Sequence, residues 1–146
     1  MTAKSALHEQ DFYAWSQQQV ALLRSGQWGQ ADIENIAGEI ETMGNSEKRE
    51  LVHRLVVLLV HLLKWQFQPA LRGNSWKLTI EEQRDQLEDH LHDNPSLKSR
   101  VDESITTAYR RATLGAARET GMDRSVFPAA CPWQFGQMVD NGFWPD

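Results

Sequence analysis

Side chains that could carry acid–base chemistry lie just before and within the most apolar run of the chain, at Glu50, Arg54 and His61. In a helix, Glu50 and Arg54 form an i, i+4 pair, and His61 follows about two turns later on the same line. Glu39 and Glu41 precede this stretch, and from a neighbouring helix either could complete a Glu–Arg–His network. These five residues are called the polar seam. Such a seam is a structural ion-pair cluster or a cleft with shifted pKa values, and we favour the structural interpretation.

The histidines at positions 53, 61 and 90 are the candidate metal ligands. Imidazole binds several transition metals, and a helical bundle can bring ligands together from separate helices. Glu50-x-x-His53 has the spacing found in di-iron bundles, but the chain has no close second copy of that motif. His53 and His61 are eight residues apart, which strains a shared ion. We therefore predict no metal site, and we interpret His61 as hydrogen-bonded to a carboxylate or a carbonyl.

Cations alternate with aromatic residues around one predicted turn after the apolar stretch. This cation–aromatic patch comprises Lys64, Trp65, Arg72, Trp76, Lys77 and Arg84. Such a combination can stack a nucleic-acid base or bind a phosphate. We favour a packing role, in which the two tryptophans anchor a corner between helices and the cations are solvated.

Other catalytic signals are weak. Cys131 precedes Pro132 without a nearby histidine, so the sequence gives little support for a cysteine nucleophile. Neither a glycine-rich phosphate loop nor paired zinc-type cysteines occur in the sequence, and no cofactor is predicted.

The element that must position the polar seam is a central helix over about residues 46–68. At 100° per residue its leucines cluster along one line, and about two-thirds of its circumference is apolar. Other helices should therefore surround it. The uncharged run is about half of the ~20 residues that a membrane span needs, so we do not expect a membrane segment.

Further amphipathic patterns predict four more helices, over about residues 9–25, 32–43, 74–92 and 95–121. In the second of these, an apolar stripe is expected to face inward, and Gly44 is expected at its C-terminal cap. That stripe comprises Ile33, Ile36, Ala37, Ile40 and Met43. Residues 1–8 are expected to be a flexible arm, and a short helical hook should follow Pro132. The sequence thus predicts an all-α fold, with residues 9–146 forming a single-domain bundle of about five main helices.

Composition narrows the functional classes. Of 146 residues, 40% are hydrophobic and 24% charged, which is typical of a globular domain. The net charge of −5 argues against broad binding to nucleic-acid phosphates or anionic lipid. A single cysteine rules out an internal disulfide and favours a reducing compartment, and the N-terminus lacks an apolar signal core. We expect a cytoplasmic protein.

Several motifs spread over the chain resemble one bacterial family. They include Asp11-Phe12-Tyr13-Ala14-Trp15, Ile33-Glu34-Asn35-Ile36-Ala37, His61-Leu62-Leu63-Lys64-Trp65-Gln66 and Cys131-Pro132-Trp133. From about Asp11 to Pro145 the sequence resembles the family known as domain of unknown function 29. The resemblance implies an α-helical domain of a bacterial cytoplasmic protein, and it implies no activity or catalytic residue.

The sequence leaves three functional hypotheses. The first is a non-enzymatic interaction or adaptor domain with a protein partner, self-association included, because complete catalytic motifs are lacking and the chain is rich in tryptophan. The second is a metal-dependent or acid–base enzyme that uses the polar seam. The third, nucleic-acid binding through the cation–aromatic patch, is not favoured by the acidic net charge.

Overall fold

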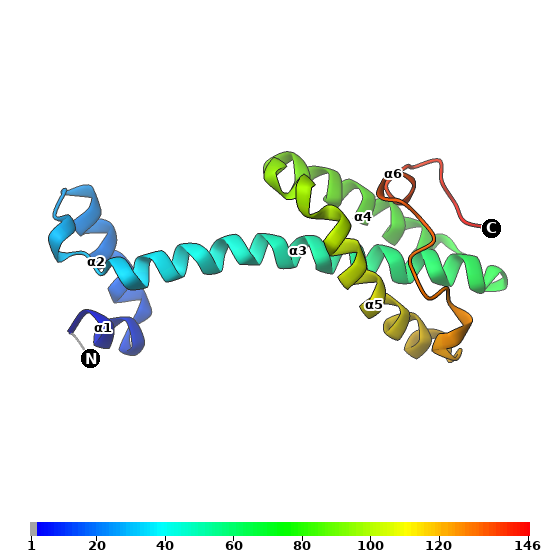
Figure 1. Cartoon of the computed structure of the whole chain (residues 1–146), viewed down its shortest axis with the longest axis horizontal. Coiled ribbons are helices and arrows are strands. Elements are labelled where there is room, and N and C mark those ends of the chain that lie inside the picture. The colour runs from blue at the N-terminus through cyan, green and yellow to red at the C-terminus, as the bar shows by residue number, and fades with distance from the viewer. Residues whose placement is uncertain (1–2) are drawn as a thin grey trace. The chain divides into compact units, whose positions relative to one another are not determined.

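The computed structural model describes residues 3–146, and within this range all regular elements are helical (Figure 1). The α-helices are α1 (Ala3–Gln10), α2 (Phe12–Arg24), α3 (Ile33–Phe67), α4 (Asn74–Asp93), α5 (Val101–Thr120) and α6 (Phe135–Met138). Short 3₁₀ helices connect them: η1 (Trp28–Gln30), η2 (Pro69–Leu71), η3 (Pro95–Arg100) and η4 (Arg124–Val126). The predicted all-α class is confirmed.

The chain divides into two compact units, an N-terminal unit (Met1–Ser46) and a C-terminal unit (Glu47–Asp146). Helix α3 contributes its first part to the N-terminal unit and the remainder to the C-terminal unit. The main apolar core lies in the C-terminal unit, because its members all come from residues 51–144. The single domain expected over residues 9–146 stays a prediction.

The core of the C-terminal unit forms where α4 and α5 pack against α3 (Figure 1). Fully buried leucines of α3 occupy its centre, and each contributes about 1.5–3 kcal/mol by leaving water. These are Leu51, Leu55, Leu58, Leu59, Leu62 and Leu63. Small residues let α5 approach closely: a Cβ added at Gly115 would lie 3.2 Å from Val60 Cγ2. The predicted central helix is therefore the spine of this unit.

Helix α3 is one continuous helix of 35 residues, whereas the sequence predicted two helices separated at Gly44. The predicted C-terminal cap at Gly44 was wrong, since the glycines with positive φ among the described residues are Gly26 and Gly121. A glycine inside a helix costs only about 1 kcal/mol. The apolar positions before and after Gly44 also keep a single helical phase, because Ile33 and Leu51 are separated by five whole turns.

The N-terminal unit begins with a helix where the sequence predicted a flexible arm. Helix α1 covers residues 3–10, and Met1 and Thr2 lie outside the described residues. The predicted helix over residues 9–25 is divided at Asp11, whose Oδ1 accepts a hydrogen bond of 3.0 Å from the Ala14 amide and so caps α2. The local N-cap thus outweighed the continuous amphipathic pattern.

A buried polar cluster joins α2 to the start of α3. Asp32 Oδ2 accepts hydrogen bonds from Trp15 Nε1 at 3.0 Å and Asn35 Nδ2 at 2.8 Å. Gln19 Oε1 accepts a hydrogen bond of 2.7 Å from the Asp32 amide. Burial raises the pKa of Asp32, but the hydrogen bonds from Asn35 and Trp15 outweigh it and leave the pKa below its usual value. These hydrogen bonds join α2 to the start of α3 around the buried Trp15.

The apolar stripe of residues 33–43 does not face inward. Ile33, Ile40 and Met43 are 56%, 59% and 60% exposed, so the expected burial of this stripe was wrong. Periodicity shows that a helix has an apolar face, but it does not show what covers that face.

Helix α4 has close to its predicted limits, whereas α5 ends as predicted but begins at Val101, because residues 95–100 form the 3₁₀ helix η3. Gly121, with φ of 73°, ends α5 in the left-handed conformation that a C-terminal glycine cap requires. After α5 the chain continues as an irregular tail containing α6, which first lies against α5 and then accepts hydrogen bonds from Arg84 of α4 (Figure 1). Trp144 near its end lies against Trp65, with ring centroids 4.7 Å apart. The predicted C-terminal hook is therefore present.

Candidate functional site

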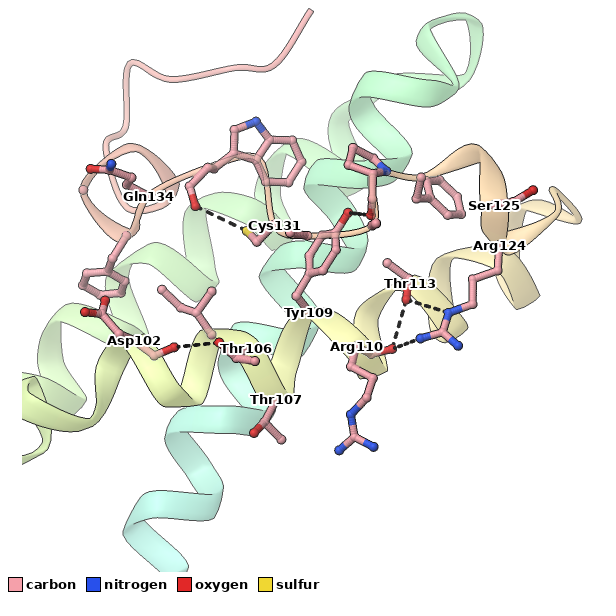
Figure 2. Close-up of a pocket in the computed structure, with 18 residues that line it drawn as sticks. Asp102, Thr106, Thr107, Tyr109, Arg110, Thr113, Arg124, Ser125, Cys131 and Gln134 are labelled. Atoms are coloured by element: carbon pink, nitrogen blue, oxygen red, sulfur yellow. Dashed lines mark hydrogen bonds between the residues drawn. The ribbon is translucent and has the colours of Figure 1, made fainter.

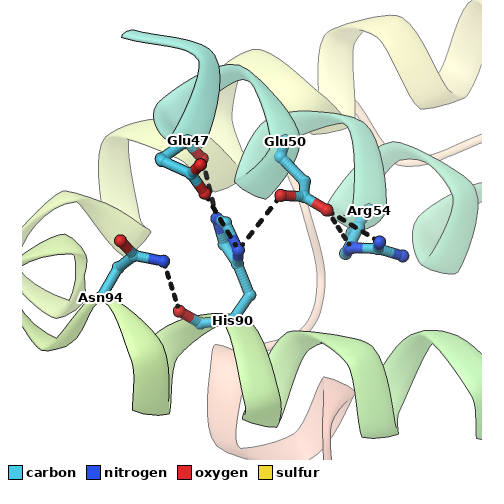
Figure 3. A network of polar contacts seen from close by, with 5 residues as sticks. All are labelled: Glu47, Glu50, Arg54, His90 and Asn94. Carbon is cyan, nitrogen blue, oxygen red and sulfur yellow. Dashed lines mark hydrogen bonds and ion pairs between the residues drawn. The ribbon is translucent and has the colours of Figure 1, made fainter. Parts of the chain in front are cut away.

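Part of the polar seam comes together at the start of the C-terminal unit (Figure 3). Arg54 donates to Glu50 Oε1 from Nη2 at 2.8 Å and from Nε at 3.2 Å. Both bonds end on Oε1, which leaves Glu50 Oε2 directed toward α4. The i, i+4 spacing thus produces the ion pair that it suggested.

His90 of α4 faces this pair and is buried, with 7% of its side chain exposed. Its Nε2 lies 2.8 Å from the backbone oxygen of Glu47. Because a carbonyl oxygen only accepts, Nε2 must carry a hydrogen. The other ring nitrogen, Nδ1, lies 3.3 Å from Glu50 Oε2 and 3.7 Å from Glu47 Oε2 (Figure 3). The result is a cluster of Glu47, Glu50, Arg54 and His90, called the carboxylate–histidine cluster below.

The remaining seam residues lie elsewhere. Glu39 belongs to the N-terminal unit, where its Oε1 lies 2.8 Å from His8 Nε2, and Glu41 is exposed there. Both occupy α3 itself, because no helix boundary separates them from Glu50. The structure therefore does not bring them onto a second helix facing Arg54 and His61.

His61 and His53 also stay apart from the cluster. His61 donates from Nδ1 to the Val57 carbonyl at 2.8 Å, as the interpretation of a carbonyl-bonded imidazole expected. Burial lowers the pKa of His61, the hydrogen bond to Val57 partly restores it, and the nearby Lys64 ammonium lowers it further. His53 is exposed on the same helix. Of the three candidate histidines, His90 is the one that forms ion-pair contacts with carboxylates.

The cation–aromatic patch holds the C-terminal tail in place. Arg84 is 2% exposed and donates to the carbonyls of Met138 at 2.7 Å and Phe143 at 2.6 Å. Arg72 donates to the carbonyls of Trp65 at 2.6 Å and Pro145 at 3.2 Å. Their guanidinium carbons also lie over indole rings, 5.0 Å from Trp144 for Arg84 and 5.2 Å from Trp65 for Arg72.

Lys64 of this patch is also engaged: its Nζ lies 4.7 Å from the ring centroid of Trp76 and 3.9 Å from Glu119 Oε1. Lys77 is exposed. The interpretation of these cations as solvated was therefore wrong for Lys64, Arg72 and Arg84. Each instead contacts a ring, a backbone carbonyl or a carboxylate within the C-terminal unit.

A cleft of about 1360 Å³ lies between α5 and the segment that follows it (Figure 2). Its polar groups bind one another: Tyr109 donates to the Pro128 carbonyl at 2.6 Å, and Arg124 donates to Thr113 Oγ1 at 3.0 Å. Burial, with a smaller effect of the neighbouring Cys131, raises the pKa of Tyr109 to about 12. The tyrosine is therefore a neutral hydrogen-bond donor at ordinary pH.

Cys131 lines the same cleft. Its thiol donates to the Trp133 carbonyl at 3.3 Å, and burial raises its pKa. A reactive cysteine needs the opposite shift, since the thiolate is the nucleophile. The geometry therefore agrees with the weak sequence support for cysteine catalysis.

A comparison of the chain with models of protein families tests the family resemblance that the sequence motifs suggested. The model of the domain of unknown function DUF29 matches residues 7–144. The chain belongs to the DUF29 family. No curated protein and no solved structure shows a significant match. The family's description assigns no activity, so the function must be argued from the residues of this DUF29 chain.

Two features of this DUF29 chain escaped the sequence reasoning. The contact between Glu47 and His90 was not predicted, and Arg84 was interpreted as a solvated cation. The apolar neighbours of Arg84 along α4, Ile80 and Leu87, lie on the same side of the helix, which was the available signal that Arg84 is buried.

Among residues 3–146, no helix is both long enough and apolar enough to cross a bilayer.

Proposed function

We propose that this DUF29 protein is a protein-interaction domain whose N-terminal unit binds an amphipathic helix of another protein. The observation that carries the proposal is the apolar stripe on the first part of α3, called the α3 stripe, in which Ile36 is half-buried and the other members are exposed: Ile33, Ala37, Ile40 and Met43. Ile33, Ile36, Ile40 and Met43 are spaced by three and four residues, which is the pattern that packs one helix against another.

The N-terminal unit leaves most of its large apolar side chains exposed to solvent. Among its described residues, the buried hydrophobic side chains are Trp15 and Ala31. Helix α2 adds further exposed apolar residues, with Tyr13 74% and Phe12 51% exposed. Isolated apolar side chains on a surface are ordinary, but a repeated helical stripe beside them is typical of a binding face.

Charge around the α3 stripe favours a basic partner. At 100° per residue, Glu39 lies along one margin of the stripe, and Glu34 and Glu41 lie along the other. The first 46 residues contain six acidic and two basic side chains, a formal charge of −4. A second copy would bring acidic margins together. A helix with lysine or arginine beside its apolar positions would complement them.

The test uses two synthetic helices of about 20 residues, long enough to form a helix on binding. Both carry isoleucine and leucine at helical spacing; one has lysines and the other glutamates along the margins. Binding to the full-length protein is measured by fluorescence anisotropy. We expect the lysine peptide to bind at least about tenfold more tightly than the glutamate peptide.

Two variants place the same new charge on opposite sides of α3. Ile40→Asp should abolish binding of the lysine peptide, while Thr42→Asp, about 160° away around the helix, should leave it intact. Equal binding of both peptides, or an Ile40→Asp variant that binds as wild type does, contradicts the proposal. Sedimentation of the wild type as a dimer that Ile40→Asp disrupts would assign the stripe to a second copy instead.

A cytoplasmic location belongs to the same proposal. A free, half-buried thiol and a net charge of −5 suit a reducing compartment and a soluble partner. Nucleic acid is not the proposed partner, because Lys64, Arg72 and Arg84 are occupied by contacts within the chain.

A further inference from the structure

The carboxylate–histidine cluster presents an arrangement that the interaction function does not use. The Glu47 carbonyl fixes the hydrogen of His90 on Nε2, as described above. In the neutral ring, the Nδ1 lone pair then points at two carboxylate oxygens, which carry no hydrogen to donate. Lone pair and carboxylates repel one another unless a positive charge lies between them. Either a second ring proton or a metal cation can supply that charge.

The distances suit a metal ion. Nδ1 lies 3.3 Å from Glu50 Oε2 and 3.7 Å from Glu47 Oε2, and the ligand atoms of the three residues all lie within 4.8 Å of one another. Ligands at 2.0–2.1 Å around a tetrahedral ion are separated by about 3.4 Å. We propose that Glu47, Glu50 and His90 bind one divalent transition-metal ion, with Nδ1 and one oxygen of each carboxylate as ligands.

The neighbours of these ligands are those that a metal site requires. A metal-binding histidine commonly donates its second ring N–H to a carbonyl, which is what His90 does with Glu47. Arg54 holds Glu50 through Oε1 alone and so leaves Oε2 available. Asn94 Nδ2 donates to the His90 carbonyl at 3.1 Å and steadies the last turn of α4 (Figure 3). The imidazole and one carboxylate are thus oriented in advance.

The site opens on one side to a polar hollow of about 390 Å³. Asp89, Asp93 and Gln86 of α4 line this hollow together with the cluster. Acidic groups outnumber basic ones there, which favours a cation over an anion. Three protein ligands leave at least one coordination position, and it would face this hollow and accept water or an oxygen ligand. One imidazole with two carboxylates suits Zn²⁺, and Mn²⁺ or Fe²⁺ as competitors.

The experiment measures Zn²⁺ binding to full-length protein purified without a histidine tag and stripped with a chelator. Isothermal titration and elemental analysis should give about one ion per chain, and unfolding should shift upward by on the order of 10 °C at a hundredfold excess over Kd. X-ray absorption of the zinc complex should show one imidazole with oxygen ligands at about 2.0 Å.

Conservative variants separate this site from other surface groups. Glu47→Gln and Glu50→Gln should each weaken binding at least about tenfold, because an amide is a poor ligand of nearly the same shape. Glu47 is 47% exposed on its side chain, so its variant tests the ligand with little risk to folding. Glu82→Gln and His92→Ala, both at exposed positions of α4, are the matched controls and should bind as wild type does.

Several results would overturn the proposal. One is the lack of stoichiometric Zn²⁺, Mn²⁺ or Fe²⁺ binding at about 100 μM free ion, a concentration well above the Kd of a built site. Another is a loss of binding in His92→Ala together with unchanged binding in Glu47→Gln, which would assign the ion to surface histidines. A third is nitrogen NMR showing a hydrogen on His90 Nδ1 that persists in the presence of metal, which would make the cluster an ion pair only.

Discussion

At the scale of single residues, backbone carbonyls determine which ring nitrogen carries hydrogen in His61 and in His90. His61 gives its Nδ1 hydrogen to Val57, four residues earlier in its own helix. His90 gives its Nε2 hydrogen to Glu47 on another helix. The bond within one helix leaves His61 a half-buried neutral ring, whereas the bond between helices turns the free nitrogen of His90 toward carboxylates. The same side chain thus packs at one position and offers a ligand at the other.

The lowered pKa of His61 predicts a loss of stability in mild acid. Burial is the main cause, and it disfavours the charged ring in the folded state. As the pH falls below about 6.5, the unfolded chain binds a proton at this residue that the folded chain does not. The free energy of unfolding should therefore decrease from pH 7.5 to 5.5, and it should level off below the folded pKa.

Urea unfolding at several pH values measures this effect, with His61→Leu as the comparison. The variant should lose part of the decrease, since leucine cannot take up a proton. A variant with the same pH slope as the wild type would show that another group is responsible.

The residue scale also shows where sequence reasoning reached its limit. Glu50 and Arg54 pair as their spacing suggested, because both partners lie on one helix. Arg84 looked like a surface cation, yet its partners are carbonyls 54 and 59 residues later in the chain. A contact between segments so far apart depends on tertiary packing. Such a contact cannot be predicted from the composition of the chain or from the spacing of its residues.

At the scale of elements, two glycines with similar sequence surroundings behave differently. Gly121 ends α5 with φ of 73°, as its position after an amphipathic pattern predicted. Gly44 follows a similar pattern, yet α3 continues through it. The two glycines differ in the residues that follow them. After Gly44 the apolar residues keep the helical phase of the preceding segment, whereas the segment after Gly121 contains prolines and does not continue the helical pattern. The common helical phase of the apolar residues before and after Gly44 was the signal of a continuous helix, and a prediction based only on the glycine cap did not use it.

This difference predicts opposite effects of alanine at the two positions. Gly44→Ala should stabilise the helix by about 0.5–1 kcal/mol, since a helical glycine only adds entropy to the unfolded chain. A Cβ there would meet no atom within 4 Å. Gly121→Ala should destabilise by about 1 kcal/mol, because alanine is strained at positive φ.

Hydrogen exchange of the amides around residue 44 and urea unfolding read out these changes. Slower exchange in Gly44→Ala supports a continuous helix. Faster exchange of these amides in Gly44→Ala would instead support the predicted helix end at Gly44.

At the scale of the whole molecule, apolar burial is distributed very unevenly. The core cluster draws on α3 from Leu51 onward and on later elements, while the N-terminal unit buries Trp15 beside Asp32. The sequence predicted the helices and the spine of this core, because both follow from periodicity. It did not predict that His90 meets Glu47 and Glu50, because periodicity gives the faces of helices and not the order in which they pack.

This distribution predicts that the C-terminal unit folds by itself. A fragment of residues 45–146 retains Asn45 and Ser46, which can cap the shortened α3, and it keeps every member of the core cluster. It should unfold cooperatively, with a midpoint within a few degrees of that of the full chain. Residues 1–46 alone should be largely unfolded, since so short a chain buries too little apolar surface.

Circular dichroism on heating and amide exchange by NMR would test both fragments. The slowest amides of the long fragment should lie in α3 around Leu55–Leu63, where side chains are completely buried. A fragment that exchanges rapidly throughout would show instead that the N-terminal unit is required for the fold, as the single-domain prediction implies. A cooperative fragment would assign the N-terminal unit a role other than folding, and binding through the α3 stripe is the role that its exposed isoleucines support.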